Sequence, residues 1–110
     1  QNAWFLEAIE QGLISTTENV NAYRSQLKTS LNGKILRINP ENGDGLPSNP
    51  FYESQNPRSP ASRIWALGLR NPYRFAIKTN TGSKNLSDGN PGTIVVGDVG
   101  WYHREELNVI

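Results

Sequence analysis

The sequence predicts an all-β protein with long loops, and three observations support this fold class. Short apolar runs recur along the second half of the chain, separated by residues that are typical of turns. The chain holds 10 glycines and 7 prolines, which interrupt helices. Hydrophobic residues make up 35%, below the usual share of a packed domain. Several short strands with little helix indicate a sandwich, a barrel or a propeller.

The composition also excludes several classes of partner and site. With 11 Lys and Arg against 10 Asp and Glu, the formal charge is +1, and we expect no nucleic acid as partner. No apolar run approaches the roughly 18 residues that span a bilayer, so no membrane span is expected. Cysteine is absent, which rules out disulfides and thiolate metal sites within this sequence.

The first part of the chain differs from the rest. Apolar residues between positions 3 and 14 follow a mixed three- and four-residue spacing, which predicts a short helix ending near Gly12. A polar, irregular connection follows over residues 15–30. We therefore divide the chain into residues 1–26, an irregular and partly helical segment whose place the sequence does not set, and residues 27–110, the β-rich part.

Strands and loops alternate in that second part. Residues 33–39 alternate as a strand and end at Pro40, after which five prolines in residues 40–62 predict a long surface loop without helix or central strand. Residues 79–92, rich in Asn, Gly and Ser, form a turn region. The remaining strands are predicted at 64–67, 73–78, 93–97 and 106–110. A last strand needs a partner, so we expect a piece of a larger protein.

The strongest candidate site is Arg70-Asn71, which follows an apolar strand and precedes Pro72. A guanidinium and an amide held at the lip of a strand form a rigid pair of planar hydrogen-bonding groups. Such a pair suits a flat ligand with several negative charges. The alternative is structural: the arginine braces a neighbouring sheet, and Asn before Pro opens a turn.

Other polar groups carry weaker hypotheses. Asp98, Glu105 and Glu106 could contribute to a cation site, although adjacent residues of a strand face opposite sides and one glutamate would point to solvent. His103 is the one histidine and falls outside any motif, so we take it as a loop residue.

Three further features have mainly structural interpretations. Asn42-Gly43-Asp44-Gly45 has the composition of a calcium loop but lacks its distal glutamate, which favours a turn. Trp65 is expected in a core between neighbouring sheets. Asn85-Leu86-Ser87 matches the acceptor sequence for N-glycosylation and indicates an exposed loop.

Three blocks of sequence stand in a fixed order. They read LNGKILRI at 31–38, IWALGLRNP at 64–72, and GDVG at 97–100 with EELNVI at 105–110. Together with LPSNPF at 46–51, they resemble the glucose/sorbosone dehydrogenase family, soluble quinoproteins that bind pyrroloquinoline quinone (PQQ). The resemblance covers residues 27–110. It implies a part, about two blades, of a six-bladed β-propeller.

The resemblance also implies a site and a reaction. Arg70 and Asn71 would contact oxygens of PQQ at the mouth of the central channel, and main-chain carbonyls of Gly100 and Trp101 would hold Ca²⁺. Carbonyl oxygens are hard ligands that suit this ion. The implied reaction oxidises the anomeric carbon of a sugar by hydride transfer to the quinone. Its base histidine would lie outside this sequence.

Two positions depart from the family pattern. Trp101 replaces a frequent proline, and Tyr73-Arg74 replaces the Gln-Gly of sugar-oxidising members, resembling instead an extracellular branch with poorly defined substrates. A second hypothesis therefore stays open, a non-catalytic propeller of the same fold that binds a carbohydrate or a protein. In either case we expect a secreted or periplasmic protein whose partners are a sugar and the rest of the propeller.

Overall fold

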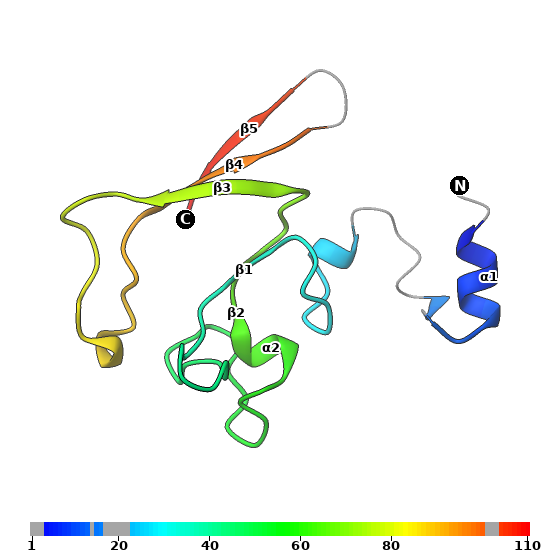
Figure 1. The fold of residues 1–110 in the computed structure, drawn as a ribbon, viewed down its shortest axis with the longest axis horizontal. Helices are drawn as coiled ribbons and strands as arrows, with labels where there is room; N and C mark the ends of the chain where they lie inside the picture. Colours follow the sequence, from blue (N-terminus) through cyan, green and yellow to red (C-terminus); the bar gives the residue numbers. More distant parts are fainter. Residues whose placement is uncertain (1–3, 14, 17–22, 101–103) are drawn as a thin grey trace.

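The computed structural model describes residues 4–13, 15–16, 23–100 and 104–110. Its strands form two small antiparallel sheets, which Figure 1 shows in sequence colours. The first sheet pairs β1 (Lys34–Leu36) with β2 (Ile64–Leu67), and the second has the order β3 (Pro72–Ile77), β4 (Ile94–Asp98), β5 (Glu106–Val109). The helical elements are α1 (Trp4–Glu10), α2 (Pro60–Arg63) and the 3-10 turns η2 (Tyr23–Ser25) and η3 (Leu86–Asp88).

The first sheet joins two segments that a long loop separates in sequence. Lys34 pairs with Leu67 and Ile35 with Ala66, and the register shifts after Ile35. The strand expected over residues 33–39 is present in its first half. It ends early because the chain then turns away, and Ile38 forms only an isolated bridge to Gly45.

The loop between β1 and β2 is organised around a buried asparagine. The Asn49 side-chain amide donates to the carbonyls of Arg37 (2.7 Å) and Ser62 (2.9 Å), which ties both ends of the loop together. The prediction that this loop holds no helix was wrong at its end, where α2 forms. Ser59 caps α2 by accepting from the Ser62 amide, and Pro60 occupies the first turn, where its missing N–H costs nothing.

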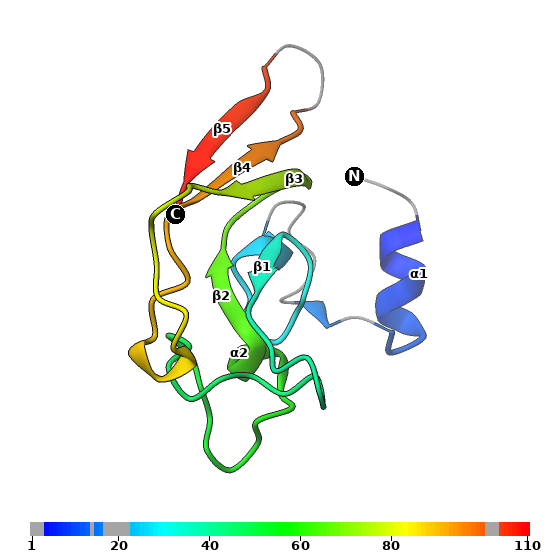
Figure 2. The same cartoon turned by 60° about the vertical axis from the view of Figure 1, so that its left-hand side comes forward.

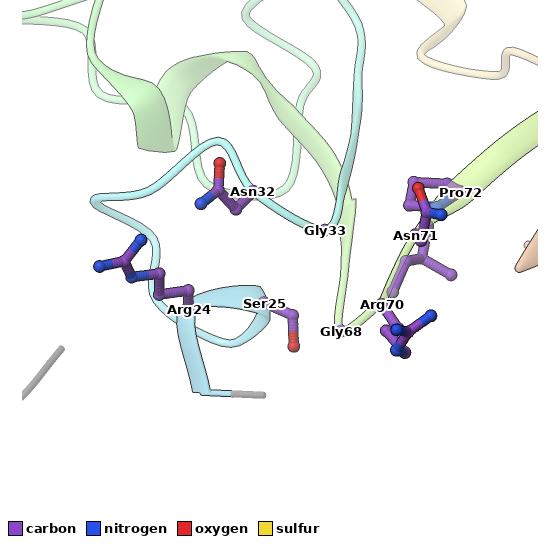
Figure 3. Close-up of a pocket in the computed structure, with 9 residues that line it drawn as sticks. Arg24, Ser25, Asn32, Gly33, Gly68, Arg70, Asn71 and Pro72 are labelled. Atoms are coloured by element: carbon purple, nitrogen blue, oxygen red, sulfur yellow. The ribbon is translucent and has the colours of Figure 1, made fainter. Parts of the chain in front are cut away.

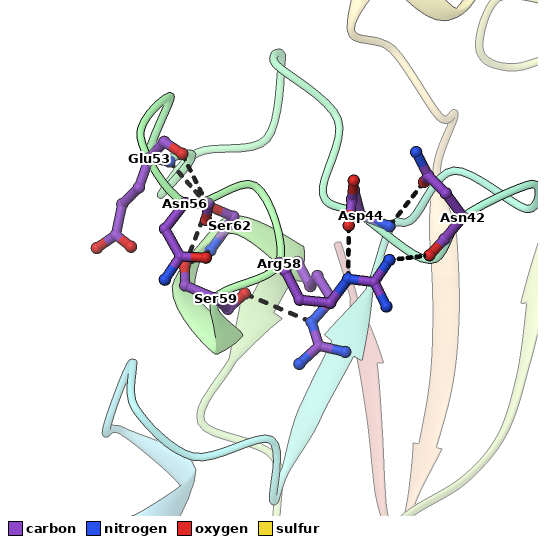
Figure 4. Close-up of polar contacts among 8 residues, drawn as sticks. Asn42, Asp44, Glu53, Asn56, Arg58, Ser59 and Ser62 are labelled. Atoms are coloured by element: carbon purple, nitrogen blue, oxygen red, sulfur yellow. Dashed lines mark hydrogen bonds and ion pairs between the residues drawn. The ribbon is translucent and has the colours of Figure 1, made fainter.

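Polar side chains stabilise the rest of this loop (Figure 4). The Ser62 hydroxyl donates to the Asn56 carbonyl at 2.8 Å and accepts from the Glu53 amide at 2.9 Å. The predicted turn at Asp44 is confirmed: its amide donates to the Asn42 side chain at 2.9 Å, and its carboxylate pairs with Arg58 at 2.7 Å. An arginine already neutralises this carboxylate, so the turn has a structural explanation.

The second sheet is a meander that packs against the first. Phe75 lies opposite Val96, which in turn lies opposite Asn108. The core joins residues of both sheets, with Trp65 and Ala66 packed against it; its buried members are Ile35, Leu69, Ile94 and Val96. Burial of each such side chain stabilises the fold by about 1.5–3 kcal/mol. Trp65, which was expected in a core between sheets, packs against this core but is only partly buried.

The all-β class is therefore confirmed, and two adjoining antiparallel sheets correspond to part of a propeller. The predicted N-terminal helix is present as α1, with Gly12 just beyond its end. Figures 1 and 2 both show α1 standing apart from the sheets. Within the part of the chain that the structure describes, no helix has the length and apolar character needed to cross a membrane.

Candidate functional site

A pocket of about 490 Å³ lies between η2, the start of β1 and the junction of β2 with β3. Figure 3 shows residues of η2 on one side and Arg70 and Asn71 on the other, with two glycines between them. The pocket therefore combines a segment from residues 1–26 with the predicted site. Its lining consists of Arg24, Ser25, Asn32, Gly33, Gly68, Leu69, Arg70, Asn71 and Pro72.

Gly33 lets the backbone form the pocket floor. Its φ is +63°, and a Cβ at this position would lie 1.9 Å from the Leu69 carbonyl oxygen. The two backbones touch here because the Leu69 amide donates to the Gly33 carbonyl at 3.1 Å. A residue with a side chain would push β1 away from the segment that carries Arg70.

Lys34 fastens η2 to this floor. Its side chain is buried, and the ammonium donates to the carbonyls of Arg24 (2.9 Å), Ser25 (2.7 Å) and Asn32 (2.8 Å). These three bonds use all of the ammonium's donors. Burial lowers the pKa of Lys34 below its ordinary value of 10.5, because removal from water disfavours the charged form.

Asp98 holds the main chain of the Arg70-Asn71 pair. It is 5% exposed, and one carboxylate oxygen accepts from the Arg70 amide at 2.9 Å while the other accepts from the Asn71 amide at 2.6 Å. The Val99 amide adds a bond to the Asn71 carbonyl at 3.1 Å. Hydrogen bonds to a charged acceptor contribute about 1.5–3 kcal/mol each. The site's backbone is therefore held from a strand distant in sequence.

The two predicted site side chains have different surroundings. The Arg70 guanidinium donates to the carbonyl oxygens of Val99 and Gly100, the second at 3.1 Å. The Asn71 side chain is exposed and lines the pocket. Its side-chain amide forms no hydrogen bond within the described part of the chain. Arg70 thus braces the end of β4 in this structure, whereas Asn71 presents both a donor and an acceptor to the pocket.

The structure also brings Gly100 to this site. Its amide donates to Glu105 at 3.2 Å, and a Cβ on Gly100 would lie 1.6 Å from the Arg104 carbonyl oxygen. Trp101, the other residue proposed to hold calcium, lies outside the described residues, as does His103.

Among the described residues, the acidic side chains near the site do not gather into a group of three that could hold a metal. Asp98 uses both oxygens for main-chain amides, and Glu106 lies opposite it on β5. Among the residues that the structure describes, no three carboxylates or histidines come together in a way that could hold a metal.

The residues present fit a quinone more readily than a calcium ion. A polyanionic planar ligand in the pocket would contact the exposed side-chain amide of Asn71 and the nearby Arg70 guanidinium. A cation at the Gly100 carbonyl would instead lie close to that same guanidinium, and like charges repel each other. The calcium assignment thus stays a prediction that rests on the resemblance.

Sequence reasoning missed three parts of this site. It gave no role to Lys34, weighed Asp98 only as a cation ligand, and left residues 1–26 unplaced, although η2 forms a pocket wall. A lysine within an apolar strand was a visible signal for burial. The role of Asp98 had no local signal, because its partners lie 27 and 28 residues away.

Comparison with known proteins identifies the family. The profile of the Glucose / Sorbosone dehydrogenase family matches residues 7–109, so the chain belongs to this family. The match starts before residue 27, so it includes most of the irregular first segment. The HIPL2 protein of Arabidopsis thaliana is 31% identical over 124 aligned residues, which cover 96% of this chain.

The chain spans 15% of the length of that curated relative. No solved structure shows a significant match to this chain. The family is thus established by sequence, and the fold by the arrangement of the strands.

Proposed function

We propose that this chain is part of a PQQ-dependent sugar dehydrogenase-like protein and contributes one wall of its cofactor site. The observation that carries the proposal is the Arg70-Asn71 pair, which lines a pocket while Asp98 holds its main chain. Membership of the glucose/sorbosone dehydrogenase family supports the same assignment. In keeping with it, we also propose that the protein is secreted or periplasmic.

In this proposal, the residues of the chain bind and orient the cofactor. The Asn71 amide would hold a quinone oxygen, and the Arg70 guanidinium would pair with a carboxylate. Bound PQQ would supply the acceptor for a hydride from the anomeric carbon of a sugar. Asp98 and Gly33 act indirectly, since they set the backbone from which these side chains extend.

A specific observation favours a second candidate, a propeller that binds a carbohydrate or protein without catalysis. The Arg70 guanidinium donates to the carbonyls of Val99 and Gly100, which is the bracing role considered from sequence. The exposed side-chain amides of Asn32 and Asn71 also line the pocket. Amides suit the hydroxyl groups of a neutral sugar.

Reconstitution of the full-length protein separates the two candidates. Purified protein is titrated with PQQ and Ca²⁺ by calorimetry and then assayed for dye reduction with a panel of aldoses. The dehydrogenase proposal expects saturable quinone binding and aldose-dependent reduction. Carbohydrate binding without any quinone binding would support the second candidate.

Replacement of Arg70 tests its role as a ligand. Arg70→Ala in the full-length protein should weaken quinone binding by about 1.5–3 kcal/mol, because a hydrogen bond to a charged group is lost. Arg74→Ala is the matched control, since Arg74 is also exposed but does not line the pocket. Unchanged affinity in a correctly folded Arg70→Ala variant would make Arg70 a brace only.

A further inference from the structure

The connection between β3 and β4 carries a feature that the proposed function does not use. At its tip, Asn85-Leu86-Ser87 is the one Asn-X-Ser/Thr sequence of the chain, with X other than proline. This sequence forms the 3-10 turn η3 and the residue that caps it. Such a sequence is an acceptor for N-linked glycans when it is accessible.

The side chains of this tripeptide already have a compact local arrangement. The Asn85 Oδ1 atom accepts from the Ser87 amide at 3.1 Å and from the Ser87 hydroxyl at 2.8 Å. Asn85 is exposed, and its side-chain nitrogen donates no hydrogen bond within the described part of the chain. The nitrogen that a glycan would use is therefore directed to solvent rather than into a contact.

The rest of the fold holds the tip at the surface. Arg37 donates to the Leu86 carbonyl at 3.1 Å, and Gly89 lies close to Ser48 of the long loop. The Leu86 side chain remains 61% exposed. None of these contacts involves the Asn85 side chain.

The tip and the pocket also lie at opposite ends of β3. Pro72, the first residue of β3, lines the pocket, whereas the chain leaves the other end of the strand at Ile77 to form the tip. From Pro72 to Ile77 the strand advances by five residues, at about 3.3 Å each, which separates these ends by roughly 17 Å. A modification at the tip would leave the pocket open.

We propose that Asn85 carries an N-linked glycan when the protein enters a eukaryotic secretory route. The donor would be an oligosaccharide linked to a lipid through a diphosphate. The Asn85 Nδ2 atom forms a bond to C1 of the first sugar and gives one proton to the solvent, while the bond from C1 to the phosphate oxygen breaks and the lipid diphosphate leaves with its electron pair. No oxidation or reduction is involved. The inference rests on the proposed secretion of the protein.

The test expresses the full-length protein behind a heterologous secretory leader in a eukaryotic host. The peptide that contains Asn85 is analysed by mass spectrometry before and after release of glycans by peptide N-glycosidase. We expect a glycan mass on this peptide, and conversion of Asn85 to aspartate after release. Quinone binding is measured on the same samples and should not differ between glycosylated and released protein.

Three variants make the result specific. Asn85→Gln should abolish the modification, and Ser87→Thr should retain it. Leu86→Pro keeps both the asparagine and the serine but should also abolish it, because proline at the middle position blocks transfer. This proline fits the fold, since position 86 is the first of η3 and Asn85 already has an extended backbone.

The outcomes distinguish this inference from the proposed function. Unmodified Asn85 in secreted protein, from a host that glycosylates a control sequon in the same fusion, would overturn the glycosylation proposal alone. A modified Asn85 without any quinone binding would support it and count against the dehydrogenase. A glycan that persists in the Leu86→Pro variant would also overturn it, because the modification would then not depend on the sequon.

Discussion

Asp98 shows how one buried side chain can determine the position of two others. Its carboxylate accepts from the main-chain amides of Arg70 and Asn71, so the Asn71 side chain is not needed to hold this backbone. We therefore expect that substitution of the Asn71 side chain leaves the local fold in place. Substitution of Asp98, in contrast, would remove or weaken the acceptor for both main-chain amides.

Substitution of Asp98 by asparagine should destabilise the protein by about 1.5–3 kcal/mol. The asparagine keeps one acceptor oxygen, but its NH₂ group would face the main-chain N–H of Arg70 or Asn71. That N–H would then have no acceptor. Denaturant unfolding measures the loss, and hydrogen exchange at the Arg70 and Asn71 amides should accelerate. Asp44→Asn is the control, because its exposed ion pair with Arg58 contributes only about 0–1 kcal/mol. Equal losses in the two variants would contradict the role given to Asp98.

The buried Lys34 leads to a second prediction, which concerns how the free energy of unfolding depends on pH. Its pKa is lowered by burial, so between that lowered pKa and 10.5 the unfolded chain binds more protons than the folded one. The free energy of unfolding should therefore rise with pH across this window and become independent of Lys34 above 10.5. Unfolding titrations at alkaline pH measure this rise, which Lys34→Met should lack. A wild-type curve parallel to that of the variant would show that burial does not perturb Lys34.

At the scale of elements, the site depends on the contact between β1 and the junction of β2 with β3. Neither element is long, and their close approach depends on the backbone contact of Gly33 with Leu69 as well as on the packing of Ile35 and Leu69 in the core. The same junction carries Arg70 and Asn71, so a shift of β1 would move the pocket floor relative to its wall.

Gly33→Ala should destabilise this contact by more than the 1–2 kcal/mol or so that the left-handed conformation alone costs an L-residue. The added Cβ would meet the Leu69 carbonyl at 1.9 Å, so the backbones must separate. Gly43→Ala is a matched control, because Gly43 has a φ of +78° but open space around its Cβ position. Thermal unfolding of both variants measures the difference. If Gly33→Ala costs no more than the control, the close approach at Gly33 does not shape the pocket.

At the scale of the whole molecule, the sheets leave apolar side chains exposed. On β5, Leu107 and Val109 are 73% and 69% exposed, and they lie on one face because they are two residues apart. The neighbouring β4 residues Gly97 and Val95 lie opposite them. In a closed propeller, the next blade would cover this face.

The isolated 110-residue chain should therefore bind an apolar dye and self-associate as its concentration rises. Replacing Leu107 and Val109 by serine should reduce both effects. In the full-length protein, the same change should instead destabilise by about 1.5–3 kcal/mol per side chain, since burial is lost. Dye fluorescence, sedimentation and denaturant unfolding measure these effects. Full stability of the doubly substituted full-length protein would show that no neighbouring blade packs on this face.

Local sequence was sufficient for the fold class and for most strands. Alternating apolar residues bounded by Gly, Pro and Asn act over a few neighbours, so they predicted the strands around Ile35, Trp65 and Val96. The helix α2 escaped prediction because a four-residue helix has almost no periodic signal, and its Ser59 cap and Pro60 were taken only as loop residues.

The all-β class, the resemblance to the quinoprotein sugar dehydrogenases and the place of Arg70 and Asn71 at a strand junction could all be read from the sequence. The surroundings of that pair could not: these are the bonds of Asp98 to the two main-chain amides, the contact of Arg70 with the Gly100 carbonyl, and the wall formed by η2 and Lys34. The difference is one of distance along the chain. Propensity and periodicity report on neighbours in sequence, whereas these hydrogen bonds join segments about ten to thirty residues apart, whose meeting depends on how the sheets pack.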